Sequence, residues 1–450
     1  MCCEALYIRE LAAWRFEMNK NGIKELMAFL DDSLTSYHAV DNIRKELLQG
    51  GFTELSERKV WSLQAGGSYF VVRNDSSVIA FRVPECEVNE IEGYHVYAAH
   101  SDSPAFKIKE NPEIEKEGVY VSLNTEKYGG MILSTWFDRP LTIAGRVCTE
   151  EGGRIVSHLV RLKDNICMIP SLAIHMNRDT NNGVAFSAQN DMLPLLTMTG
   201  QESRERSSKG MLNAILTQSM ARTTGRILSY DLFVENCEKA VLAGAEDEFI
   251  MTPRYDDLAC VFAGLKGIVN AGSARYIDVL AVFDNEEVGS LTRQGADSTF
   301  FKDTLENIAD GLDAGAKVYR TWKADSFMIS ADNGHACHPN QGGKADLTNR
   351  PYLNRGVVLK YHGGQKYATD AYSAAYVRKL CSRNDIPLQT YANHSDIPGG
   401  STLGNLAMAQ ISMAAADIGL PQLAMHSAYE TGGAKDIEYL IRLAESFFRE

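Results

Sequence analysis

The sequence lacks any uninterrupted apolar run of roughly 20 residues, the length that a helix needs to cross a bilayer. Its start lacks the charged region, apolar run and cleavage site of a secretory signal. It also lacks an excess of positive charge, since 45 Lys and Arg residues face 58 Asp and Glu residues and the formal net charge is -13. An acidic chain repels phosphate backbones and anionic lipid. We therefore expect a cytoplasmic protein that binds neither nucleic acid nor membrane.

The sequence also lacks motifs of closely spaced cysteines. The nine cysteines form no CxxC pair, the spacing that metal and redox sites use. We expect reduced thiols. Apolar residues make up 45% of the chain and charged residues 23%, which is typical of a folded globular protein. Because 450 residues exceed what one core usually fills, we expect two domains or one large insertion.

Short apolar runs alternate with helical patterns along much of the chain. The runs are YHVYAA (94–99), YIDVLAVF (276–283), SFMISA (326–331) and PQLAM (421–425). Such runs are typical of strands buried on both faces of a mainly parallel sheet. Helical patterns cover 257–272 and 367–384. The alternation predicts an α/β fold, with a mixed, mainly parallel sheet sandwiched by helices.

The middle of the chain has a different pattern. Between about 105 and 245, short β-branched segments such as LTIAGRVCT are separated by turn residues. This pattern predicts an all-β insertion over 104–246, which divides the remaining domain into 18–103 and 247–450. Residues 19–40 have the pattern of a capped amphipathic helix. We expect translation to begin naturally at Met18 and residues 1–17 to be a non-native or disordered extension.

A ligand-type side chain follows each buried run. These residues are His100, the pair Glu286 and Glu287, Asp332 and His426. Taken singly, each is an ordinary polar group or helix cap. In open α/β sheets, however, the carboxyl ends of strands line the crevice where ligands bind. Carboxylates gathered there destabilise one another unless a cation compensates their charge, so the set indicates a metal site.

Three further features sharpen this prediction. Asp102 lies two residues after His100 and can orient its ring through the second nitrogen. The adjacent acids Glu286 and Glu287 allow one to bind metal while the other accepts a proton, although they also suit a solvated acidic turn. Asp256 precedes a helical pattern and either caps that helix or bridges two cations.

Several motifs together resemble those of the aspartyl aminopeptidase family of co-catalytic zinc metallopeptidases. They are AAHSDSP, YGGMILSTWFDRPL, IPSLAIHMNR, TPRYDDL, FDNEEVGS, SADNGHACHPN and PQLAMHSAYETGG, in the family's order. The resemblance runs from about Asn19 to the C-terminus. It implies an aminopeptidase that removes N-terminal residues from peptides with two divalent metal ions.

The resemblance also implies residue roles. One metal would be held by His100, Asp256 and Asp332, and the other by Asp256, Glu287 and His426. Glu286 matches the family's general base, and Asp102 matches the acid that orients His100. Two histidines and three carboxylates suit zinc, which we expect, and also manganese or cobalt.

The family's assembly gives His175 a role. This residue resembles the histidine that reaches a neighbouring subunit's active site to bind the oxyanion, although it also suits a plain surface position. In the family the β domain mediates dimers that build tetrahedral dodecamers. We expect 104–246 to be a dimerisation domain and the chain to form the same assembly.

The resemblance implies a preference for acidic N-terminal residues, Asp or Glu, and this expectation rests on Lys360. It matches the lysine that pairs with an acidic substrate side chain in acid-specific members, although a strand lysine can also reach water. Asn349 stands where some acid-specific members carry His, which keeps a neutral preference open. The alternatives are a related deacylase or glutamyl-type aminopeptidase and, in another class, a non-catalytic scaffold. The YGGMILSTWFDRPL motif favours the aspartyl aminopeptidase family over the deacylase and the glutamyl-type enzyme. A scaffold would have lost the base or a ligand, and all of these residues are present.

Overall fold

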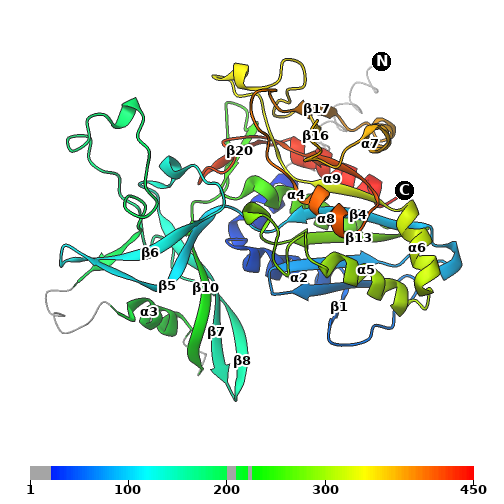
Figure 1. Ribbon diagram of the computed structural model, residues 1–450, viewed down its shortest axis with the longest axis horizontal. Coiled ribbons are helices and arrows are strands. Elements are labelled where there is room, and N and C mark those ends of the chain that lie inside the picture. The colour runs from blue at the N-terminus through cyan, green and yellow to red at the C-terminus, as the bar shows by residue number, and fades with distance from the viewer. Residues whose placement is uncertain (1–21, 200–208, 221–224) are drawn as a thin grey trace, which may run out of the picture.

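The chain folds into two lobes, each with its own β-sheet (Figure 1). The computed structural model describes residues 22–199, 209–220 and 225–450. The expected extension 1–17 and the expected start at Met18 lie outside these residues. Every helix in the described ranges is too short or too polar to span a bilayer.

The larger lobe contains a nine-stranded sheet in the order β1-β2-β3-β13-β4-β14-β18-β16-β17. Its strands are β1 (Thr53–Leu55), β2 (Ser68–Arg73), β3 (Ser77–Arg82), β4 (Gly93–His100), β13 (Tyr276–Phe283), β14 (Phe327–Ala331), β16 (Val357–Tyr361), β17 (Leu388–Ala392) and β18 (Ala414–Gly419). The central strands β13, β4, β14 and β18 are parallel to one another, whereas β3 and β16 pair antiparallel with their inner neighbours. The predicted mixed, mainly parallel sheet is confirmed.

Helices cover both faces of this sheet. One face packs against a helix over 22–32 and against α2 (Ser36–Gln49), α4 (Tyr255–Asn270), α7 (Ala371–Arg383) and α9 (Asp436–Phe447). The other face packs against α5 (Phe300–Gly311), α6 (Gly315–Asp325) and α8 (Leu403–Gln410). The predicted α/β sandwich is therefore present.

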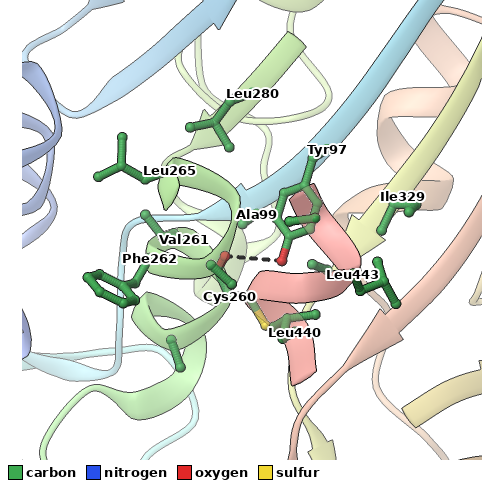
Figure 2. Close-up of a cluster of buried hydrophobic side chains, with 14 of the residues drawn as sticks. Tyr97, Ala99, Cys260, Val261, Phe262, Leu265, Leu280, Ile329, Leu440 and Leu443 are labelled. Carbon is green, nitrogen blue, oxygen red and sulfur yellow. Dashed lines mark hydrogen bonds between the residues drawn. The ribbon is translucent and has the colours of Figure 1, made fainter. Parts of the chain in front are cut away.

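The central strands form because their residues are apolar on both faces. All eight residues of β4 are buried, and so are seven of the eight in β13. The helix α4 lies close against them, with α9 beside it on the same face of the sheet (Figure 2). The hydroxyl of Tyr97 donates to the carbonyl of Cys260 at 3.1 Å. A Cβ on Gly264 would lie 2.6 Å from the Tyr97 ring, so this close approach requires glycine. The packing fixes where the ends of β4 and α4 lie.

The smaller lobe contains a six-stranded antiparallel sheet in the order β8-β7-β10-β5-β6-β9. Its elements are β5 (Ala105–Lys116), β6 (Tyr120–Tyr128), β7 (Leu141–Glu151), β8 (Arg154–Arg161), β9 (Leu195–Met198), β10 (Arg226–Asn236) and the helix α3 (Met211–Ser219). Its buried side chains form a separate hydrophobic cluster. We call residues 105–236 the β unit. Because it carries α3, the unit is not purely β.

One strand prediction was wrong in its placement. PQLAM was expected in the main sheet, but β18 takes that position. The run instead contributes β19 (Pro421–Leu423) to a small sheet with β11 (Val241–Ala243), β12 (Phe249–Thr252), β15 (Gly334–His335) and β20 (Glu430–Gly433). Gly419 lies against the Asp332 carbonyl where the chain leaves the main sheet, and Pro421 has no N–H to continue a ladder. His426 therefore reaches the site from this small sheet.

The predicted helix over 19–40 is also different in detail. It consists of two helices, 22–32 and α2, separated at Ser33–Thr35. The guanidinium of Arg254 donates to the carbonyls of Ser33 and Leu30 at 3.1 and 3.4 Å. A distant side chain thus satisfies carbonyls at the end of the first helix, which the local pattern does not reveal.

Candidate metal centre

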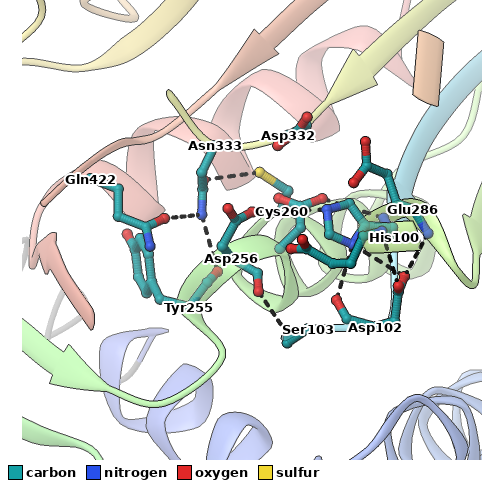
Figure 3. Close-up of polar contacts among 12 residues, drawn as sticks. His100, Asp102, Ser103, Tyr255, Asp256, Cys260, Glu286, Asp332, Asn333 and Gln422 are labelled. Atoms are coloured by element: carbon teal, nitrogen blue, oxygen red, sulfur yellow. Dashed lines mark hydrogen bonds and ion pairs between the residues drawn. The ribbon is translucent and has the colours of Figure 1, made fainter. Parts of the chain in front are cut away.

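The predicted ligands come from five separated parts of the larger lobe. His100 is the last residue of β4, and Asp332 directly follows β14. Glu286 and Glu287 begin the short 3-10 helix η4 (Glu286–Val288) just beyond β13. The strands β13, β4 and β14 are neighbours and parallel, so their carboxyl ends meet at one edge. Figure 3 shows His100, Asp256, Glu286 and Asp332 around this edge.

Asp256 lies at the centre of the group. Its Oδ1 atom is 3.8 Å from Nε2 of His100, and its Oδ2 atom is 3.7 Å from Nε2 of His426. Ligand atoms within 4.8 Å of one another form the sets His100–Asp256–Asp332 and Asp256–Glu287–His426. A third set joins His100 to Glu286 and Glu287. One carboxylate therefore faces two histidines with different oxygens.

Asp256 does not cap the helix α4. Its backbone angles are non-helical although it lies in the first turn, and α4 has no side-chain cap. The carbonyl of Asp256 accepts from the hydroxyl of Ser103 at 2.7 Å, which anchors its backbone (Figure 3). The side chain is thus free to face the site.

Hydrogen bonds fix the tautomers of both histidines. Nδ1 of His100 lies 3.0 Å from the carbonyl and 3.4 Å from the carboxylate of Asp102, both of which only accept when the carboxylate is ionised. Nδ1 of His426 lies 2.9 Å from the carbonyl of Gly130. Both Nδ1 atoms must carry hydrogen, so in the neutral rings the lone pairs of Nε2 face Asp256.

Burial and crowding shift the acids of the site. Burial and then the charge of Asp332 raise the pKa of Asp256 to about 7. Burial also raises the pKa of Glu286 to about 8, although His100 opposes this. Burial alone would lower the pKa of His426, but Glu287 and Asp256 raise it to about 10. Burial and neighbouring carboxylates thus both disfavour negative charge on these acids, and cations would offset this.

A cavity of about 270 Å³ opens onto these residues. Lys360, on β16, lines it and is only 2% exposed. Its ammonium group donates to the carbonyl of Asn333 at 2.8 Å and lies 3.5 Å from the carboxylate of Asp332. Burial alone would lower the pKa of Lys360, but Asp332 raises it above its ordinary value. Lys360 is thus a buried cation that lines the cavity and does not extend to water.

Two predicted residues lie elsewhere. His175 is exposed on a loop of the β unit and does not line the cavity within the described residues. Asn349 lines a neighbouring cavity of about 310 Å³, where its amide donates to Asp346 at 2.9 Å. Neither residue joins the metal-type side chains of its own chain.

Sequence reasoning missed Glu430. This buried carboxylate accepts from the backbone N–H of Asp256 at 3.0 Å and of His426 at 2.6 Å. It therefore holds two loops that are 170 residues apart in sequence. The signal was its place in the HSAYETGG motif, four residues after His426, but the pattern alone does not reveal its backbone partners.

Known proteins share this fold and sequence. Residues 29–448 match the family model described as Aminopeptidase I zinc metalloprotease (M18). The chain belongs to the M18 aminopeptidase family. A probable M18 family aminopeptidase 2 of Clostridium acetobutylicum is 42% identical over 427 residues, which cover 94% of this chain and 98% of that relative. The expected resemblance to zinc metallo-aminopeptidases is confirmed.

Solved structures agree with the M18 assignment. Ape4, solved in complex with Nbr1, superposes with a TM-score of 0.91 at 34% identity, covering 96% of this chain and 86% of that one. The mApe1 dodecamer of S. cerevisiae superposes with a TM-score of 0.80 at 25% identity, covering 95% and 96%. This M18 chain is a metallo-aminopeptidase, a hydrolase that acts on peptide bonds.

Proposed function

We propose that this M18 aminopeptidase works with two metal ions bridged by Asp256 and removes acidic residues from the N-termini of peptides. The observation that carries the two-metal proposal is the placement of the Asp256 carboxylate, whose two oxygens face different histidines. His100 and Asp332 would complete one site, and Glu287 and His426 the other. A bridging carboxylate is what a pair of close cations requires.

The residues present fit such ions. Oδ1 of Asp256 is buried and has no hydrogen-bond partner in the described part of the chain. A buried acceptor without a partner is costly, and a cation would satisfy it. Nitrogen and oxygen donors without a thiolate suit zinc, and also manganese or cobalt. We propose zinc at both sites, in keeping with the family description.

Bound divalent ions would polarise the scissile carbonyl and make water more acidic. The protein's own part in the chemistry then falls to Glu286. Burial raises the pKa of Glu286 to about 8, and its carboxylate lies outside the two sets that share Asp256, so it can accept a proton from the attacking water and return it to the leaving amine. Asp102 holds the backbone N–H groups of Glu286 and Glu287 at 3.1 and 3.2 Å.

Lys360 supports the acidic preference. Its buried positive charge lines the same cavity as the metal-type residues, so an Asp or Glu side chain of a substrate would meet a desolvated cation there. Asn349 lies in the neighbouring cavity and adds no second charge to the cavity that Lys360 lines. The preference for acidic over neutral residues thus depends on Lys360.

Assembly would complete the site. Near His175 the loop exposes Leu172, Ile174 and Met176, which are 57%, 47% and 75% exposed. Clustered apolar side chains of this kind mark protein contacts. We propose that residues 104–246 form the dimerisation domain and that residues 18–103 and 247–450 form the catalytic domain. Dimers would build a tetrahedral dodecamer, in which His175 would reach the active site of a neighbouring subunit. The mApe1 relative is solved as a dodecamer.

A substrate panel tests this function. The zinc-loaded protein would be assayed on Asp-, Glu-, Leu- and Lys-aminoacyl chromogenic compounds, each with a free and with an acetylated N-terminus. The proposal predicts turnover of free Asp and Glu compounds above the others. Turnover of acetylated compounds alone would indicate a deacylase, and preferred cleavage of Leu compounds would overturn the acidic preference.

A further inference from the structure

One short segment of the β unit contacts two ligands of one proposed metal site directly and a ligand of the other through Asp102. Tyr128, Gly129 and Gly130 directly follow one another at the end of β6. We infer that Tyr128–Gly130 is a positioning element through which the β unit holds the ligands of both sites in its own chain. The inference rests on the proposed two-metal function and adds residues whose effect is indirect.

Tyr128 acts on the first site through Asp102. Its hydroxyl donates to Oδ2 of Asp102 at 2.7 Å, and Asp102 in turn accepts from Nδ1 of His100. The direction is settled because the side-chain amide of Asn285 donates to the Tyr128 oxygen at 2.7 Å, so the phenol proton is left for the carboxylate. Tyr128 therefore keeps Asp102 in place and ionised, which fixes the His100 ring.

The bonds extend beyond Tyr128. Oδ1 of Asn285 accepts from Oγ1 of Thr292 at 2.7 Å and from Nε2 of Gln294 at 2.8 Å. The amide of Asn285 is thus oriented, and its NH₂ group must point to Tyr128. Asn285 is also the residue before Glu286, so this network joins β6 to the turn that carries the base.

The two glycines act on the second site. A Cβ on Gly129 would lie 3.2 Å from the Cβ of Glu287 and 3.4 Å from its Oε2, and the φ angle of Gly129 is 79°. Glycine therefore lets the segment pass against this ligand. The carbonyl of Gly130 accepts from Nδ1 of His426 at 2.9 Å, which orients its ring. One segment thus contacts Glu287 and His426 directly and His100 through Asp102.

Zinc binding to the full-length protein tests the inference. Metal-free protein would be titrated with zinc against a chromogenic chelator. Loss of such supporting contacts typically weakens metal binding roughly 10-fold to 100-fold. We expect Tyr128→Phe to weaken one zinc equivalent by this factor and Gly129→Ala to weaken the other. Cobalt absorption spectra should change in both variants, since they report ligand geometry.

Tyr230→Phe is the matched control. Its hydroxyl donates to the main-chain carbonyl of Lys109 at 2.9 Å within the same sheet, away from the metal residues. We expect this variant to bind two zinc ions like the wild type. If both Tyr128→Phe and Gly129→Ala bind zinc like the wild type, or if Tyr230→Phe weakens it equally, the inference is wrong. If the wild type itself binds no zinc, the proposed function fails instead.

Discussion

At the scale of single side chains, Asp256 and Glu286 have different surroundings, which support the different roles proposed for them. Asp256 has both oxygens turned to histidines, which suits a ligand. Glu286 lies within ligand distance of His100 but outside the two sets that share Asp256. A carboxylate that lies beside the proposed ligands without belonging to either set suits a general base.

The role of general base proposed for Glu286 predicts how the variant Glu286→Gln behaves. The amide keeps the size of the side chain but cannot accept a proton, so turnover should fall roughly 100-fold to 10,000-fold. Zinc content, measured by elemental analysis, should stay at the wild-type value, as should the oligomer mass. Near-wild-type turnover in this variant would refute the role of Glu286.

Much of the site was predictable residue by residue. His100, Glu286, Glu287 and Asp332 follow apolar runs that the structure shows as neighbouring parallel strands. Glu430 and Tyr128 were not predictable, because they act through a backbone N–H and through another carboxylate. Such partners depend on tertiary distances, and their side chains have no distinctive spacing.

At the scale of elements, α2 joins the two lobes. It contacts β3 of the main sheet and β7 of the β unit. His38 on α2 is buried and lies 2.8 Å from the hydroxyl of Thr35. Burial, then the charges of Arg161 and Arg254, lower the pKa of His38 to about 4 from its ordinary value of 6.5. The folded protein therefore disfavours a proton that the unfolded chain accepts.

Acid should lower the free energy of unfolding through His38. Between pH 6.5 and pH 4 the unfolded chain binds the proton and the folded one does not, so stability falls as the pH falls through this window. From pH 7 to pH 5 the wild type should lose about 2 kcal/mol more unfolding free energy than His38→Gln. Urea unfolding at both values measures the difference, and equal losses would contradict it.

The strands were more predictable than the connections. YIDVLAVF is β13 residue for residue, because seven of its eight positions are apolar or aromatic and such a run suits a buried strand. PQLAM was assigned to the wrong sheet, since short apolar runs do not reveal their partners. The break before α2 depends on Arg254, more than 200 residues away.

At the scale of the whole molecule, the α/β fold and the presence of a β-rich middle followed from the order of patterns. The strand order of the nine-stranded sheet and the third, small sheet did not, because pairing across long separations leaves no local signal. His175 illustrates the same limit. It lies exposed on a loop of the β unit, and the role proposed for it requires a second chain.

Assembly should therefore control activity. Leu172→Glu with Met176→Glu would place charges on the exposed loop beside His175 and should prevent subunit contact. We expect a lower mass by light scattering, at least about 10-fold lower turnover because the neighbour's donor is lost, and unchanged zinc content. Val60→Glu, at a fully exposed apolar residue of the larger lobe, is the control and should leave all three unchanged. A dissociated protein with full activity would refute the role of His175.

The central claim is that Asp256 bridges two metal ions. Anomalous X-ray diffraction at the zinc edge, from crystals of the zinc-loaded protein, tests it most directly. The account predicts two anomalous peaks about 3.5–4 Å apart, one beside each oxygen of Asp256, with His100 and His426 on opposite sides. A single peak, or peaks away from Asp256, would contradict it.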